Sequence, residues 1–260
     1  MLQIIFGVPY LLLFLNKYRR FIERKFIPWW GFVLIAFLIF YSPVIFIKFA
    51  SFYLTVVLIT FLREETLRDV LLFFVIWLPV EFGILPMTNL NTGEFAGYLL
   101  VVSIFSHILV SEIKPEGLDF SFNRIPPGVI IKGYLILAVI LIPLGLLMGF
   151  LRFSPGLSVF RLFLIVTIFF LVGFPEEMLF RALLFKIILK WFDIRTTVIL
   201  SAVIFGLAHF NGPHGGLSYI LMASIAGLGY GVIYWRARSV TASALLHSLI
   251  DYTWVLFFGG

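Results

Sequence analysis

Long apolar runs separated by short polar connections dominate the pattern of residues along this chain. The longer runs approach the roughly 20 residues that an α-helix needs to cross a hydrocarbon core of about 30 Å. The pattern therefore predicts an all-α fold, a polytopic transmembrane helical bundle with about eight to ten membrane helices. The predicted helices lie near residues 2–15, 27–47, 49–62, 70–87, 96–111, 128–151, 157–174, 175–192, 196–211, 216–235 and 239–259.

Two polar stretches interrupt the apolar runs. Residues 63–69 carry charges of both signs and predict a solvated loop, and residues 112–127 form the longest polar connection. The second stretch predicts a boundary between N-terminal transmembrane helices, residues 1–127, and a C-terminal transmembrane core, residues 128–260. The first part shows no recognised motif, whereas the second holds all of its motifs within residues 175–251.

Composition supports a membrane environment and excludes several classes of function. Hydrophobic residues make up 62% of the 260 residues and charged residues 12%, whereas soluble domains average about 45–50% and about 25%. The absence of cysteine excludes disulfides, thiolate metal sites and a cysteine nucleophile. The net charge of +6 does not indicate nucleic-acid binding, because basic residues cluster beside apolar runs, as is typical of membrane anchoring. One such cluster is Lys17, Arg19, Arg20, Arg24 and Lys25.

Ionisable residues inside the predicted membrane helices are concentrated in the C-terminal half of the chain. A charged side chain in a bilayer costs about 2.5–3.5 kcal/mol on insertion scales, so such residues normally indicate function or internal pairing. These positions are Glu176, Glu177, Arg181, His209, His247 and Asp251.

The first motif is Pro175-Glu176-Glu177, followed by Arg181. Proline suits the first turn of a helix, so we expect a helix to begin here with both glutamates at the positive end of its dipole. Glu177 and Arg181 are four residues apart with the carboxylate first, which favours an ion pair on one helix face. Glu176 points about a quarter-turn away, where the motif guarantees it no partner on its own helix. The simpler interpretation is a helix start with a salt bridge.

Two histidines follow on later helices. His209 ends the apolar run that starts at Val198, where it is either a functional group or a hydrogen-bonded packing residue. His247 and Asp251 are four residues apart on one helix face, so the carboxylate can accept the imidazole proton and fix its tautomer. The alternative is a buried polar pair that holds two helices together.

In this order, the EExxxR, FxxxH and HxxxD motifs resemble the CAAX protease and bacteriocin-processing (CPBP) family of intramembrane proteases, which includes CAAX prenyl endopeptidases of the Rce1 type. The resemblance covers roughly residues 160–259. It implies that Glu176 is the general base that activates water, and that His209 and His247 hold the water or stabilise the oxyanion. Asp251 completes the polar set, and because it adds a negative charge, orienting His247 is its expected role.

The same resemblance makes Glu177 and Arg181 supporting partners that fix the helix mouth. Glu176, His209 and His247 also match a zinc-binding set with an open position for water. The usual zinc-protease helix signature, HExxH, is absent. The sequence leaves both a zinc-bound mechanism and a metal-free glutamate mechanism open.

The resemblance predicts an integral membrane endopeptidase that hydrolyses a peptide bond of a membrane-associated peptide or protein. Prenylated C-termini, leader peptides and C-terminal sorting tails are the substrates considered. We expect a multi-pass protein of a prokaryotic cell membrane, with the lipid bilayer as its other partner and no nucleic acid. Two alternatives are a non-enzymatic immunity or scaffold protein with the same fold, and a transporter or proton channel, because intramembrane Glu and His also build proton relays.

Overall fold

The computed structural model describes four parts of the chain, residues 64–81, 127–156, 159–210 and 216–258. All regular elements in these parts are helices, which confirms the all-α prediction for them. The chain divides into two compact units, Met1–Lys114 and Pro115–Gly260, and each is described by itself. The helices predicted before residue 63 and near residues 96–111 lie outside the described residues, and the boundary predicted between residues 127 and 128 stays a prediction.

The described helix of the first unit is α5, Glu65–Glu81. The prediction of a solvated loop at residues 63–69 was wrong, because the helix begins at Glu65 and Asp69 is fully buried. The Glu64 carboxylate accepts hydrogen bonds from the backbone N–H groups of Thr66 and Leu67. The acidic charges therefore cap and begin a helix, where the helix dipole favours them.

Among the described residues of the second unit, three helices are long and apolar enough to cross a membrane. They are α7 (Pro127–Leu147), α12 (Leu217–Ala237) and α13 (Val240–Phe257). Their lengths of 21, 21 and 18 residues agree with the predicted runs near 128–151, 216–235 and 239–259. The shorter apolar helix α11, Ile194–Leu207, matches the run predicted near 196–211. A multi-pass membrane protein is thus supported, and the total of eight to ten membrane helices stays a prediction.

The motif glutamates lie on one continuous helical segment. It consists of α8 (Val159–Ile168), the π-helical turn η2 (Phe169–Gly173), α9 (Phe174–Glu177), the π-helical stretch η3 (Met178–Leu184) and α10 (Phe185–Leu189). The residues at the junctions of these pieces all have right-handed helical backbone angles. The prediction of two separate helices, 157–174 and 175–192, was therefore wrong.

A widened turn explains why Pro175 does not begin a new helix. Inside an α-helix, proline removes one N–H donor and its ring clashes with the carbonyl four residues earlier. Here the backbone N–H of Phe174 bonds to the carbonyl of Phe169, five residues earlier, which is the π-helical pattern. The wider turn accommodates Pro175 within the helix. Glu176 and Glu177 consequently do not lie at a helix N-terminus, and the predicted dipole effect on them was wrong.

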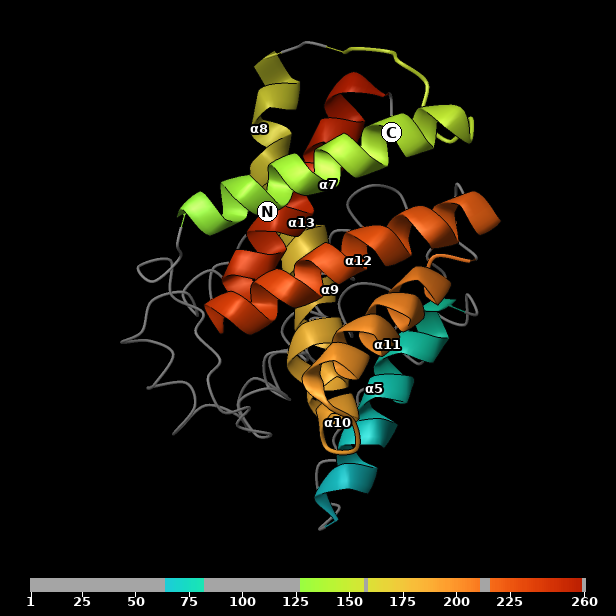
Figure 1. The fold of residues 1–260 in the computed structure, drawn as a ribbon, viewed down its shortest axis with the longest axis vertical. Coiled ribbons are helices and arrows are strands. Elements are labelled where there is room, and N and C mark those ends of the chain that lie inside the picture. Colours follow the sequence, from blue (N-terminus) through green and yellow to red (C-terminus); the bar gives the residue numbers. More distant parts are fainter. Residues whose placement is uncertain (1–63, 82–126, 157–158, 211–215, 259–260) are drawn as a thin grey trace, which may run out of the picture. The chain divides into compact units, whose positions relative to one another are not determined.

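The helices of the second unit pack around α12 and α13. Helix α12 lies between α7 and α11, and it also contacts α13 (Figure 1). Helix α13 contacts α7 and the segment from α8 to η3. Two of the largest fully buried side chains of this unit, Arg181 and Glu177, carry opposite charges. The others are Tyr230, Phe185, Phe205, Met178 and Leu246. The core is therefore built around an ion pair.

Two N-terminal caps fix where helices of the core begin. The Asp193 carboxylate caps α11 by accepting from the N–H groups of Arg195 and Thr196. The hydrogen bond from the Thr196 hydroxyl, with these backbone N–H groups, holds the pKa of Asp193 below its usual range. Ser239 caps α13 by accepting from the N–H of Ala242 at 3.2 Å.

Replacing the cap of α13 tests its contribution to stability. The Ser239→Ala substitution leaves the Ala242 N–H without its buried acceptor, and we expect it to lower the free energy of unfolding by about 1 kcal/mol. Thermal unfolding in detergent micelles measures the change. Ser239→Gly is the matched control, because glycine at this position costs only a few tenths of a kcal/mol. Equal stability of Ser239→Ala and the wild type would contradict the capping role.

Candidate functional site

Four of the polar side chains singled out by the sequence meet in the second unit. Glu176 comes from α9, and His209 lies just beyond the end of α11. His247 and Asp251 lie on successive turns of α13. The Glu176 carboxylate oxygen Oε2 is 3.8 Å from His247 Nε2 and 4.0 Å from His209 Nε2. His247 Nε2 is also 3.3 Å from Asp251 Oδ2, so the i,i+4 contact predicted on α13 is present.

Both ring nitrogens of His247 face carboxylates. Nδ1 lies 3.2 Å from Glu177 Oε1, and Nε2 lies 3.3 Å from Asp251 Oδ2. Carboxylates only accept hydrogen bonds, so two N–H donors satisfy this arrangement and the imidazolium form fits it best. The ring is buried and stacks on Tyr230, with centroids 4.5 Å apart and an interplanar angle of 16°. The edge-to-face contact with Phe205 at 5.6 Å also holds the orientation of the ring.

Glu177 has a wider set of contacts than its spacing from Arg181 indicated. The fully buried carboxylate lies 3.1 Å from Arg181 Nε, as the motif predicted. It also contacts His247 Nδ1 and accepts a hydrogen bond from the Ser243 hydroxyl. The sequence motifs did not include Ser243. It lies one turn before His247 on the same face of α13 as Asp251, and this spacing could have indicated that it belongs to the site.

Arg181 ties this charge cluster to the neighbouring helices. Its guanidinium Nη2 donates to the backbone carbonyl of Gly227 on α12 at 3.2 Å. The same group lies over the Phe205 ring of α11, 5.1 Å from its centroid. Because Glu177 contacts α13, the pair joins α9, η3, α11, α12 and α13 at one buried point.

The tautomer of His209 follows from a local hydrogen bond. His209 Nδ1 lies 2.7 Å from the backbone carbonyl oxygen of Phe205. A carbonyl oxygen only accepts, so Nδ1 carries the proton, and in the neutral ring Nε2 has a lone pair. Nε2 faces Glu176 at 4.0 Å, and the two side chains are 17% and 30% exposed. A water molecule between them can therefore hydrogen bond to both groups.

The close approach of α11 to α12 places His209. A Cβ atom at Gly206 would meet the Ile220 carbonyl oxygen at 2.6 Å and the Ser224 hydroxyl. We expect Gly206→Ala to lower the free energy of unfolding by about 1–3 kcal/mol through overpacking. Thermal unfolding in detergent micelles measures the change. Gly128→Ala is the matched control because its Cβ meets no atom within 4 Å, and a Gly206→Ala variant as stable as this control would refute the packing argument.

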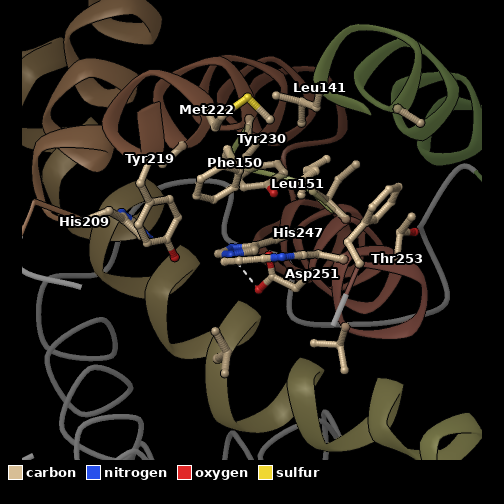
Figure 2. Close-up of a pocket in the computed structure, with 18 of the residues that line it drawn as sticks. Leu141, Phe150, Leu151, His209, Tyr219, Met222, Tyr230, His247, Asp251 and Thr253 are labelled. Carbon is tan, nitrogen blue, oxygen red and sulfur yellow. Dashed lines mark ion pairs between the residues drawn. The ribbon is translucent and has the colours of Figure 1, made fainter. Parts of the chain in front are cut away.

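The site opens on a cavity of about 320 Å³, within the usual range for small-ligand pockets. Glu176, His209, His247 and Asp251 all line it, whereas most of the remaining wall is apolar. Figure 2 shows Leu141 and Met222 in this wall, with His247 and Asp251 beside the cavity. The cavity therefore joins a polar end to an apolar chamber.

Glu176, His209 and His247 are the residues that the sequence suggested as ligands for a zinc ion. Among the described residues, no group of three His, Cys, Asp or Glu side chains is arranged to hold one. Glu176 and His209 offer suitable donor atoms, whereas His247 directs both nitrogens at carboxylates. The zinc site from Glu176, His209 and His247 stays a conditional prediction, and no step proposed for the reaction passes through a metal.

The described part of the second unit is all-helical, and its Glu–His site lies beside helices that are long and apolar enough to cross a membrane. Residues 158–253 match the family model described as type II CAAX prenyl endopeptidase Rce1-like. This segment is thus an Rce1-like domain of the CPBP family, and the resemblance carried by the three motifs is confirmed. The match covers less than half of the chain. No curated protein and no solved structure matches it.

Proposed function

We propose that this protein is an integral membrane endopeptidase that hydrolyses a peptide bond of a membrane-associated peptide or protein. The observation that carries the proposal is the convergence of the Glu176 carboxylate with His209 and His247, at 3.8–4.0 Å, on the wall of a largely apolar cavity. The match of residues 158–253 to a family model described as type II CAAX prenyl endopeptidase Rce1-like supports the same class of reaction.

The proposed mechanism begins with a water molecule held between Glu176 and His209. Glu176 removes a proton from this water as its oxygen attacks the carbonyl carbon of the substrate. The His247 imidazolium shares its Nε2–H between Asp251 and the oxyanion that develops, while Glu177 accepts the Nδ1–H and helps to hold the ring charged and oriented. Glu176 then gives the proton to the leaving amine, the C–N bond breaks, and the carboxylate is regenerated.

The cavity indicates the type of substrate. Its walls are mainly apolar side chains from α7, α12 and α13, so burial of an apolar group there is favourable. We propose that the substrate places an apolar or lipid-modified segment in this chamber, with the scissile bond at Glu176. A membrane-associated peptide meets this requirement better than a soluble polar peptide.

A cleavage assay tests the proposal. The purified chain in liposomes is mixed with fluorescence-quenched peptides in three sets: prenylated C-terminal peptides, leader-peptide junctions and apolar C-terminal tails. We expect internal cleavage of at least one set by the wild type and no cleavage by Glu176→Gln. A folded wild-type protein that cuts no peptide in any set would favour a non-enzymatic role, and proton flux across the same liposomes would favour a transporter or channel.

A further inference from the structure

The oxyanion of a hydrolysis reaction needs hydrogen-bond donors, and one of the two site histidines is poorly suited to be one. His209 already donates its Nδ1 proton to the Phe205 carbonyl oxygen, so in the neutral form of the ring Nε2 has a lone pair and no proton to donate. His247 presents its Nε2–H towards Glu176 and Asp251. Oxyanion sites commonly combine more than one donor. A second donor is therefore to be sought on the His209 side of the cavity.

Tyr219 lies on that side. It belongs to the first turn of α12 and lines the same cavity as Glu176 and the two histidines. Its ring is 4.9 Å from the His209 ring in an edge-to-face contact, and it stacks on Phe150 at 5.3 Å. Trp254 contacts it from α13 at 5.7 Å. These three rings restrict the orientation of the phenol.

Figure 2 shows the Tyr219 ring beside His209, with its hydroxyl on the side of the cavity that holds His247. A phenol carries its proton at neutral pH and so is a hydrogen-bond donor there. Tyr230 also lines the cavity, but it is 1% exposed and stacks its ring face on His247. Tyr219 is only partly buried and its hydroxyl is the better placed of the two to reach a substrate.

We infer that Tyr219 is a catalytic residue of this site, whose hydroxyl donates a hydrogen bond to the carbonyl oxygen of the scissile peptide. The inference rests on the proposed function. The O–H bond of Tyr219 stays intact throughout, and its hydrogen bond strengthens as negative charge develops on the substrate oxygen in the transition state. His247 donates from one side and Tyr219 from the other, while Glu176 and His209 hold the attacking water.

Tyr219→Phe removes the hydroxyl and leaves the packing of the ring in place. We expect kcat to fall on the order of 10²-fold, as for loss of one oxyanion donor, with KM changed by less than about twofold. The midpoint of thermal unfolding should stay at the wild-type value. Tyr234→Phe is the matched control, because Tyr234 lies on the same helix and packs against Phe185, outside the cavity lining. It should keep the wild-type kcat.

The assay uses whichever quenched peptide the full-length wild-type protein cleaves in liposomes. A wild-type kcat for Tyr219→Phe, or a rise in KM alone, overturns the inference and leaves the proposed function standing, provided that Glu176→Gln is inactive. A fall of similar size in Tyr234→Phe also overturns it, since the loss would then be a general effect of removing a hydroxyl. Failure of the wild type to cleave any peptide overturns the proposed function itself.

Discussion

Replacing Arg181 with methionine is expected to lower the free energy of unfolding by about 3–5 kcal/mol. The guanidinium is fully buried and its Nε lies 3.1 Å from Glu177 Oε2. Without it, the equally buried Glu177 carboxylate loses its cationic partner on the same helix. The hydrogen bond to the Gly227 carbonyl and the contact with the Phe205 ring are lost as well. Thermal or denaturant unfolding in detergent micelles measures the change.

Arg236→Met is the matched control for this substitution. Arg236 is exposed near the end of α12, so its loss should change stability by less than about 0.5 kcal/mol. The double variant Glu177→Gln/Arg181→Met removes both buried charges and should recover much of the stability lost by Arg181→Met alone. It should remain a poor enzyme, because glutamine does not hold His247 as an imidazolium. Equal stability of Arg181→Met and Arg236→Met would contradict the role of the buried pair.

Glu176→Gln is expected to reduce kcat/KM by about 10²- to 10⁴-fold, the contribution that a positioned general base commonly makes. Glutamine keeps the shape of the side chain but does not take a proton from water. Stability should change little, because the Glu176 side chain is 30% exposed and its ion-pair contacts within the described residues are with the imidazoles of His209 and His247. Steady-state cleavage rates and thermal unfolding of the same preparations separate the two quantities.

Two further variants make this prediction specific to the carboxylate at this position. Glu176→Asp keeps a carboxylate base, but its side chain is one methylene shorter and holds the base farther from the water molecule. We therefore expect an activity between those of the wild type and Glu176→Gln. Asp251→Asn keeps a hydrogen-bond acceptor beside His247 and removes the carboxylate charge there. A larger loss in Asp251→Asn than in Glu176→Gln would assign the base to Asp251 instead.

Local spacing predicted the parts of the site that lie on a single helix. Glu177 and Arg181 are an i,i+4 pair, as are His247 and Asp251, and both contacts are present in the structure. Such contacts follow from helix geometry alone. The family motifs then indicated that Glu176 belongs with the histidines, which no single-helix pattern contains.

Contacts between helices were not predictable in this way. Glu177 meets Ser243 and His247 only because α9 packs against α13. Tyr219 meets His209 only because α12 turns back beside the end of α11. Neither pairing leaves a periodic signal in the sequence, since the partners lie on different helices. The charge network and the candidate oxyanion donor therefore required the structure.

Two predictions of helix boundaries were wrong, each for a local physical reason. Pro175 resembles a helix start, but a π-helical turn bonds Phe174 to Phe169 and allows the helix to continue through it. The charged residues from Glu64 to Asp69 resemble a loop, but they cap and begin α5. In both places the sequence contains residues that commonly occur at helix ends. The backbone hydrogen bonds decide whether a helix begins, ends or continues there.

The decisive measurement is cleavage of a quenched membrane peptide in ¹⁸O-labelled water, with the products identified by mass spectrometry for the wild type and for Glu176→Gln. Hydrolysis by the proposed site predicts two fragments from the wild type, with one solvent oxygen in the new C-terminal carboxylate, and no such fragments from Glu176→Gln. Equal yields of labelled fragments from the two proteins would contradict the role of Glu176. A folded wild-type protein that leaves every peptide of the three sets intact would contradict the assignment as an endopeptidase.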